Sequence, residues 1–119
     1  MSARTAARAD KRRKRFAPIP RPALAPGARP LTMRQIAYFA SAVELGSMTA
    51  AAEVHDITVQ GLSQALADVE NEVGAVLLDR GKKGVSPTPL GEELYALAAE
   101  ILGRYVEFEE LARSHGRKA

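Results

Sequence analysis

The sequence predicts a mainly α-helical domain that carries one small β-hairpin. Aromatic residues make up only 5% of the chain and alanine is abundant, a composition that favours helices over sheets. Apolar residues recur at helical spacing in several segments, and capping residues stand at the ends of these segments. One further segment has glycines where a tight turn between two strands needs them. A chain of 119 residues is long enough for one such domain with tails.

The first helix is predicted to begin after Thr32. Thr32 and Gln35 have the spacing of a capping box, in which each side chain bonds the backbone N–H of the other residue. Gly46 supplies the left-handed conformation that ends the helix. The apolar residues between these caps recur at helical spacing: Ile36, Phe39, Ala40 and Val43. Folding is therefore expected to begin at Leu31.

A short second helix and a longer third helix follow. Ser47 caps the second helix, which runs to about residue 54 and buries Met48, Ala51 and Ala52. Ile57 is expected in the core of the turn, and Thr58 caps a third helix that Gly74 ends. The third helix has a core-facing stripe made of Leu62, Leu66, Val69 and Val73. Its opposite face presents Val59, Gln60, Ser63, Gln64 and Ala67 to solvent or to a ligand.

A hairpin and a long helix complete the domain. Residues 76–78 and 85–86 are predicted strands around a tip formed by Gly81, Lys82, Lys83 and Gly84. Thr88 caps the last helix, Pro89 takes its first position, and the helix runs to about Arg113. Its apolar residues recur near every 3.5 positions and are Leu94, Leu97, Ile101, Tyr105, Phe108 and Leu111. Because this stripe is longer than the core of a small domain can cover, we expect it to pair with another chain. The elements together make a winged helix-turn-helix with a three-helix core, a two-stranded wing and a long C-terminal dimerisation helix.

Positive charge is concentrated outside the predicted helix-turn-helix. Residues 1–30 hold nine Lys and Arg residues against one Asp, and are expected to be a disordered basic arm and Pro-rich linker. The stretch from Gln35 to Asp79 holds seven acidic residues and no Lys or Arg. A basic arm on an acidic domain is typical of proteins that hold nucleic acid loosely, and a solvated tail that aids solubility is an equal alternative. The predicted organisation is the arm and linker (1–30), the winged helix-turn-helix domain (31–88), the dimerisation helix (89–113) and a disordered tail (114–119).

Composition and motifs argue against several classes of protein. The absence of cysteine rules out disulfides and thiolate zinc sites and fits a cytoplasmic protein. No apolar run is long enough to cross a membrane, and no apolar stretch follows the basic start as in a secretory signal, although an organellar transit peptide is a minor alternative. No Ser/His/Asp grouping, phosphate loop or paired buried acid is visible, so catalysis, a cofactor and a metal are not expected. His55 and His115 are expected to be surface histidines.

From Leu31 to about Leu102 the chain closely resembles the DNA-binding domain of LysR-type transcriptional regulators. The motifs that carry the resemblance are Met33-Arg34-Gln35-Ile36-x-Tyr38-Phe39, Gly46-Ser47-Met48-Thr49-x-Ala51-Ala52-Glu53, Leu62-Ser63, Glu70-x-Glu72-Val73-Gly74, Leu77-Leu78-Asp79-Arg80 and Thr88-Pro89-Leu90-Gly91-Glu92. The resemblance implies a winged helix-turn-helix that binds double-stranded DNA and a linker helix that dimerises.

The chain departs from the family pattern in two ways. It stops where the effector-binding domain of the family begins, so no small-molecule ligand is implied. The family's recognition helix commonly opens with Ser-Gln and carries Arg or Lys further along, whereas this chain has Thr58-Val59 followed by Gln64, Ala65 and Ala67. Gln60 stands one residue later than the usual glutamine.

The residues predicted to contact DNA are polar or basic residues of the helix-turn-helix and the wing, together with one valine. They are Arg34, Ser47, Thr49, Thr58, Val59, Gln60, Ser63, Gln64, Arg80, Lys82 and Lys83. Gln pairs most specifically with adenine, and the cations suit phosphates. The alternatives are that Thr58 and Ser63 only cap or solvate the helix, that the lysines protect a strand edge, and that Arg34 pairs with a nearby acid.

The leading hypothesis is a sequence-specific DNA-binding regulator that acts as a homodimer, with residues 58–73 in the major groove and the arm from Arg4 to Arg15 adding cations. The rival is a non-catalytic interaction protein that heterodimerises with a full-length relative and weakens its DNA binding. A truncated gene product without a selected role is a third possibility, and an enzyme ranks last.

Overall fold

The computed structural model describes residues 16–116. The chain divides into two units, Met1–Pro30 and Leu31–Ala119. Residues 16–30 of the first unit are exposed and contain no helix or strand, only a turn in which the Ala28 N–H donates to the Ala25 carbonyl at 3.0 Å. The predictions for the basic arm up to Arg15, and for the tail beyond residue 116, lie outside the described residues.

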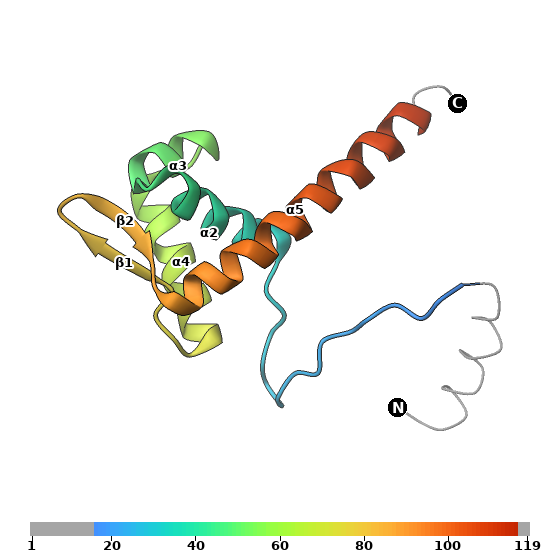
Figure 1. Ribbon diagram of the computed structural model, residues 1–119, viewed down its shortest axis with the longest axis horizontal. Coiled ribbons are helices and arrows are strands. Elements are labelled where there is room, and N and C mark those ends of the chain that lie inside the picture. The colour runs from blue at the N-terminus through green and yellow to red at the C-terminus, as the bar shows by residue number, and fades with distance from the viewer. Residues whose placement is uncertain (1–15, 117–119) are drawn as a thin grey trace. The chain divides into compact units, whose positions relative to one another are not determined.

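The second unit contains four helices and a two-stranded antiparallel sheet in the described residues (Figure 1). In chain order these are α2 (Met33–Leu45), α3 (Met48–Val54), α4 (Val59–Val73), β1 (Leu78–Gly81), β2 (Gly84–Pro87) and α5 (Pro89–Gly116). The helices α2, α3 and α4 pack on one another, and the hairpin flanks them as a wing. The predicted mainly α-helical, winged helix-turn-helix fold is confirmed.

The N-terminal cap of α2 is the predicted capping box. The Thr32 Oγ1 accepts the Gln35 N–H at 3.1 Å, and the Gln35 Oε1 accepts the Thr32 N–H at 2.9 Å. Gly46 ends the helix with a φ of 63°, in the left-handed region. Both ends of α2 are therefore set by local sequence.

The caps of α3 and α4 also follow the sequence prediction. The Ser47 Oγ accepts the Ala50 N–H at 3.1 Å, and the Thr58 Oγ1 accepts the Gly61 N–H at 2.9 Å. Gly74 ends α4 with a φ of 80°. These caps satisfy backbone groups that helix termini leave without partners, and they fix where α4 starts relative to α3.

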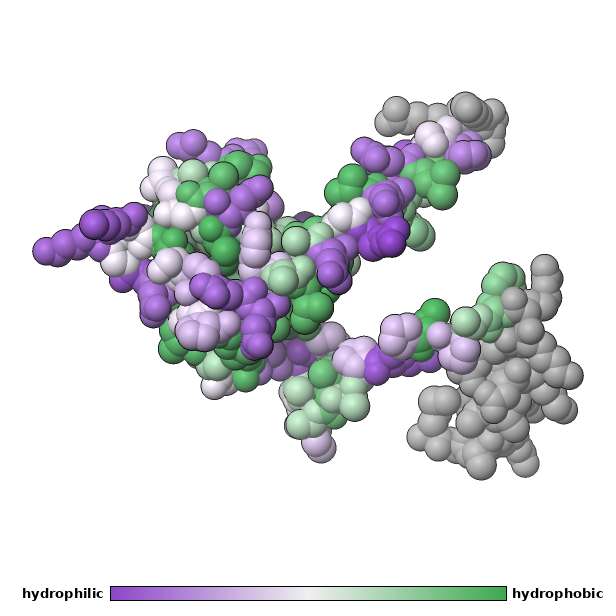
Figure 2. Space-filling view, viewed as in Figure 1, coloured by the Kyte–Doolittle hydropathy of each residue, from purple (hydrophilic) through white to green (hydrophobic). Residues whose placement is uncertain are grey.

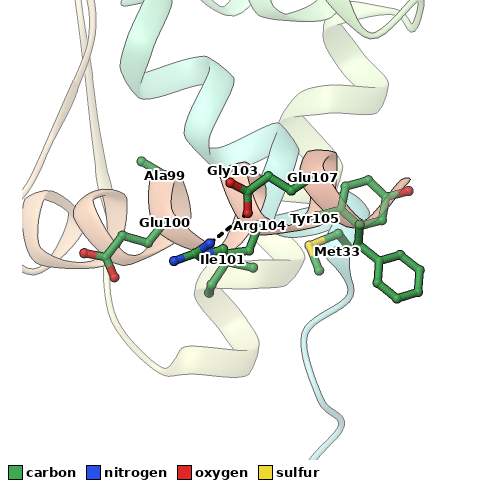
Figure 3. Close-up of a pocket in the computed structure, with 9 residues that line it drawn as sticks. Met33, Ala99, Glu100, Ile101, Gly103, Arg104, Tyr105 and Glu107 are labelled. Atoms are coloured by element: carbon green, nitrogen blue, oxygen red, sulfur yellow. Dashed lines mark hydrogen bonds and ion pairs between the residues drawn. The ribbon is translucent and has the colours of Figure 1, made fainter. Parts of the chain in front are cut away.

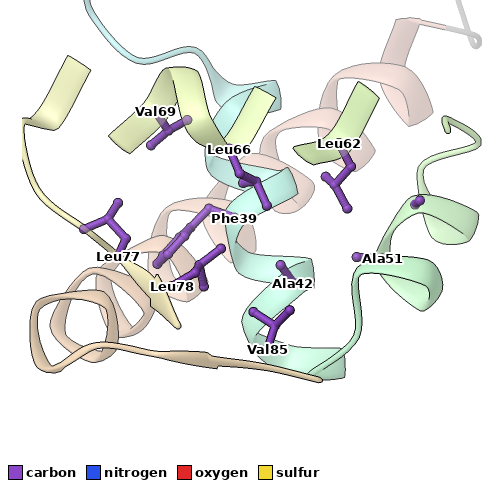
Figure 4. Close-up of a cluster of buried hydrophobic side chains, with 10 residues drawn as sticks. Phe39, Ala42, Ala51, Leu62, Leu66, Val69, Leu77, Leu78 and Val85 are labelled. Atoms are coloured by element: carbon purple, nitrogen blue, oxygen red, sulfur yellow. The ribbon is translucent and has the colours of Figure 1, made fainter. Parts of the chain in front are cut away.

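The core lies between α2, α3, α4 and the hairpin (Figure 4). Its buried residues are Phe39, Ala42, Ala51, Ala52, Leu62, Leu66, Val69, Leu77, Leu78 and Val85. Alanines at 42, 51 and 52 let α2 and α3 approach closely, because small side chains leave room for the backbones. The predicted core residue Val73 is instead 39% exposed, because the stripe of α4 leaves the core after Val69.

The first strand of the wing begins and ends later than predicted, and the second is one residue longer at each end. The ladder pairs Leu78 with Pro87 and Arg80 with Val85, whereas the sequence predicted strands at 76–78 and 85–86. Residues 76 and 77 lie before the ladder because the backbone N–H groups at this point donate to a side chain and not to the facing strand. The Glu70 Oε2 accepts the N–H of Leu77 at 2.7 Å and that of Leu78 at 3.2 Å.

The wing is attached to the end of α2 through Gly84. The Val85 N–H donates to the Gly46 carbonyl oxygen at 3.1 Å. Gly84 has a φ of 115°, and a Cβ on it would lie 2.3 Å from that same carbonyl oxygen. Residue 84 must therefore be glycine for the wing to lie against α2.

The first turn of α5 lies beside the hairpin. The Thr88 Oγ1 accepts the Gly91 N–H at 3.1 Å and donates to the Val76 carbonyl at 2.9 Å. Leu94 packs against the core, Leu102 and Tyr105 still border α2, and only the outer end of the helix extends away from the other elements to Gly116 (Figure 1). Its end lies three residues past the predicted Arg113.

Candidate nucleic-acid interface

The exposed face of α4 begins at its capped N-terminus. Val59 is 38% exposed and Gln60 is exposed, while Leu62 and Leu66 on the opposite side of the helix are buried in the core. Within the described part of the chain, the Gln60 side chain makes no hydrogen bond, so its amide keeps both its donors and its acceptor. A side chain of this kind can recognise a hydrogen-bonding base edge.

The side chain of Gln64, one turn further along α4, already makes one hydrogen bond. Its Nε2 donates to the Asp68 Oδ1 at 3.0 Å. This contact uses one of the two amide hydrogens and places a carboxylate beside the glutamine. The two glutamines are equal candidates by sequence, and the geometry favours Gln60 as the freer of the two.

Arg80 joins the wing to α4. Its Nη1 donates to the Ser63 Oγ at 2.7 Å, across 17 residues of sequence. No Lys or Arg lies between Gln35 and Asp79, so this guanidinium brings to α4 a positive charge that its own sequence lacks. The structure thus brings together two predicted site residues from different elements.

Lys82 and Lys83 form the tip of the β1–β2 hairpin. Both are exposed, and this end of the wing is strongly hydrophilic in Figure 2. Two ammonium groups on a projecting turn can approach a phosphate backbone without displacing any core residue.

The remaining residues that were predicted to contact DNA differ in their surroundings. Ser47 uses its hydroxyl oxygen to cap α3, whereas Thr49 is exposed on α3. Arg34 is exposed in the first turn of α2, where it lines a depression together with Leu102 and Tyr105 of α5. Arg34 therefore borders α5 as well as the helix-turn-helix.

His55 is not the simple surface histidine that the sequence suggested. It is half-buried, its Nε2 lies 2.8 Å from the Ser41 Oγ, and its ring meets the Tyr38 ring edge-to-face at 4.8 Å. These contacts tie the end of α3 to α2, which explains the residue without any metal. The described residues contain no group of three or more His, Cys, Asp or Glu side chains able to hold a metal ion.

A stripe of apolar side chains is exposed along α5. Leu97 is 55% exposed, Ile101 41%, Tyr105 43%, Phe108 72% and Leu111 64%. Leu94, predicted as part of this stripe, is half-buried against the core, so the exposed part begins at Leu97.

A shallow groove runs along this stripe. Met33 of α2 borders it together with Ile101, Tyr105 and Phe108 (Figure 3). The ion pair between the Arg104 Nη1 and the Glu107 Oε2, at 2.9 Å, lies at its polar edge. The groove is thus an apolar surface with a charged border.

Glu109 stabilises the outer part of α5. The Arg113 Nε donates to its Oε1 at 2.6 Å, and the Tyr105 hydroxyl donates to its Oε2 at 3.1 Å. The hydrogen bond from Arg113, followed by that from Tyr105, lowers the pKa of the Glu109 carboxyl below its ordinary value.

No helix among residues 16–116 is long and apolar enough to span a membrane.

Comparison with known sequences identifies regulatory proteins. Residues 33–92 match the family described as bacterial regulatory helix-turn-helix protein, lysR family. The nitrogen assimilation regulatory proteins nac of Klebsiella aerogenes and of Escherichia coli K12 are each 44% identical to this chain over 82 residues, which is 69% of this chain and 27% of theirs. The chain thus spans about a quarter of the length of these curated relatives.

Comparison with solved structures gives the same class of domain. The BenM DNA-binding domain in complex with benA site 1 DNA is 31% identical with a TM-score of 0.65, covering 71% of this chain and 98% of that one. The CbnR DNA-binding domain in complex with DNA is 27% identical with a TM-score of 0.64, covering 72% and 99%. A Corynebacterium glutamicum OxyR mutant is 30% identical with a TM-score of 0.69, covering 71% of this chain and 27% of the mutant.

Proposed function

This chain belongs to the lysR family of bacterial regulatory helix-turn-helix proteins, and we propose that it is a cytoplasmic transcriptional regulator that binds double-stranded DNA as a dimer. The observation that carries the proposal is the exposed face of α4, which begins at a capped N-terminus and has a wing cation bonded to it. The DNA complexes of the similar BenM and CbnR domains support it. We assign no catalytic role.

In this proposal α4 enters the major groove. The N-terminal residues of a recognition helix approach base edges, which assigns that contact to Val59 and Gln60. Gln60 donates to N7 and accepts from N6 of an adenine, and Val59 contacts a thymine methyl group. Gln64 makes a second base contact with the amide hydrogen that Asp68 leaves unused. The hydroxyls of Ser47, Thr49 and Thr58 lie at the phosphate backbone.

Phosphate affinity comes from the flanks of the domain. The wing supplies Arg80, Lys82 and Lys83, and Arg34 adds a cation at the start of α2. The basic arm from Arg4 to Arg15 supplies more, because the stretch from Gln35 to Asp79 supplies none.

A tethered cleavage reagent tests the placement of α4. The chain has no cysteine, so Gln60→Cys gives a single attachment point for an iron chelate that cuts nearby DNA. Val106→Cys is the matched control, since Val106 is 49% exposed on α5, away from α4. A labelled duplex should be cut much faster by the reagent at position 60. Equal cutting from both positions would exclude α4 as the groove element.

Dimerisation is assigned to the exposed stripe of α5. Phe108 at 72% exposure is the most exposed large apolar side chain of the stripe, and exposed apolar area of this extent favours association. The spacing of the stripe, near one residue in 3.5, is that of helices that pair along their length.

One pair of variants tests the dimer. Phe108→Glu places a charge in the stripe and should convert the dimer to a monomer in sedimentation velocity. Val106→Glu makes a similar change on the opposite face of the same helix and should leave the dimer intact. A monomeric wild type, or dissociation by both variants alike, would contradict the assignment.

A second proposal rests on the charge of the helix-turn-helix. The seven acidic residues between Gln35 and Asp79 oppose DNA binding, and the stripe of α5 suits pairing with a longer relative. The chain would then form heterodimers that bind DNA poorly. Mixing it with a full-length relative decides between the two: co-elution with loss of operator binding supports the second proposal, and independent elution excludes it.

A further inference from the structure

We propose that Ser63 is a positioning residue, which holds the guanidinium of Arg80 against the exposed face of α4 so that it meets a phosphate at the edge of the groove. The inference rests on the proposed DNA binding and adds a residue role to it. It predicts that Ser63 acts on DNA through Arg80 and not through its own hydroxyl.

The register of the wing directs Arg80 toward α4. Side chains two residues apart on a strand share a face, so Arg80 is on the same face as Leu78, which is buried in the core. Its cross-strand partner Val85 is buried as well. Asp79 and Ser86, the neighbouring pair in the ladder, are on the outer face and exposed.

Ser63 receives this side chain from α4. The Oγ of Ser63 and the Nη1 of Arg80 are 2.7 Å apart, a short hydrogen bond to a charged donor. In the described residues Arg80 has no ion pair with a carboxylate, so its charge is not neutralised. A guanidinium has five N–H donors, which leaves four for a phosphate oxygen after the bond to Ser63.

The contact matters because α4 has no cation of its own. An arginine on a free strand would lose side-chain freedom when it binds a phosphate, and this loss weakens binding. The bond to Ser63 orders the side chain beforehand, in the position where a basic residue on α4 would otherwise be needed. By holding Arg80 of the wing in this position, Ser63 gives α4 the positive charge that an arginine on the helix itself would provide.

A double-mutant cycle in the full chain tests this role. Binding to a fluorescein-labelled duplex of mixed sequence is measured by anisotropy for Ser63→Ala, Arg80→Ala and the double variant. We expect Arg80→Ala to flatten the slope of log affinity against log salt by about 0.9. Ser63→Ala should weaken binding about threefold in the wild-type background and have no effect in the Arg80→Ala background.

Two further variants separate positioning from simple damage. Ser63→Thr keeps a hydroxyl at the site and should bind like the wild type. Ser86→Ala removes a hydroxyl from the outer face of the wing and should change nothing. Both results support the role.

Several outcomes would overturn it. Equal weakening by Ser63→Ala with and without Arg80 means that Ser63 contacts DNA by itself, and DNA binding by the chain then stands without the positioning role. No weakening by Ser63→Ala overturns it too. A wild-type chain that binds no duplex even at low salt removes the proposed function together with this inference.

Discussion

Replacing Gly91 by alanine should loosen the junction between the wing and α5. A Cβ on residue 91 would lie 2.2 Å from the carbonyl oxygen of Leu77 and 3.2 Å from the Cβ of Pro87. The carbonyl belongs to the backbone and accepts the Thr88 N–H at 3.0 Å, so it cannot rotate aside. A carbon and a carbonyl oxygen need about 3.3 Å, so the start of α5 must move by roughly 1 Å.

The expected cost follows from three contributions. Overpacking of this kind costs about 1–3 kcal/mol. Loss of the bond between Thr88 and Leu77 costs about 1 kcal/mol more. Alanine gains about 1 kcal/mol over glycine inside a helix. Gly91→Ala should therefore lower the free energy of unfolding by about 1–3 kcal/mol.

Gly103 provides the matched control in the same helix. A Cβ there would meet nothing within 4 Å, so Gly103→Ala has only the helix-propensity gain and should stabilise by about 1 kcal/mol. Urea unfolding followed by far-UV circular dichroism, at one protein concentration, gives both values. Equal effects of the two substitutions would show that close approach is not what requires glycine at residue 91.

Three smaller predictions concern single side chains. Glu70→Ala leaves two amides at the start of β1 without their acceptor and should cost about 2–4 kcal/mol in urea unfolding, whereas Glu70→Gln should cost about 1 kcal/mol; equal costs would contradict this. Thr58→Ala removes the cap of α4 and should cost about 1 kcal/mol by the same measurement, with no loss arguing against the cap. The lowered pKa of Glu109 means that its bond with Arg113 stabilises α5 above the ordinary pKa of the carboxyl and is lost as pH falls through the lowered value. Helicity measured from neutral to acid pH should show this loss in the wild type and less of it in Glu109→Gln.

Helix ends were predictable from sequence because their signals are local. Thr32, Ser47 and Thr58 each bond a backbone N–H three residues away, and Gly46 and Gly74 adopt the left-handed conformation expected of them. These interactions need no information about the rest of the fold.

The wing was predicted less well because it depends on distant groups. Its first amides bond to Glu70, seven and eight residues earlier, which delays the ladder to Leu78. Gly84 approaches the end of α2, and no periodic pattern in the sequence reveals such a contact.

The candidate site was predicted as a set of residues but not as an arrangement. Ser63 and Arg80 were each predictable from sequence as separate candidates, and only the fold joins them at 2.7 Å. The contact of His55 with Ser41 was equally hidden, because the two residues belong to different helices and meet only through the packing of the end of α3 on α2.

The central claim is that phosphate affinity comes from the wing and the basic arm, and the salt dependence of DNA binding tests it most directly. The slope of log affinity against log salt should be measured for the wild type, for a chain lacking residues 1–16, and for a chain in which Arg80, Lys82 and Lys83 are replaced by glutamine. We predict that each change flattens the slope by about 0.9 for every phosphate that the altered chain no longer neutralises. Unchanged slopes in both altered chains would contradict the claim, because α4 has no cation to neutralise those phosphates instead.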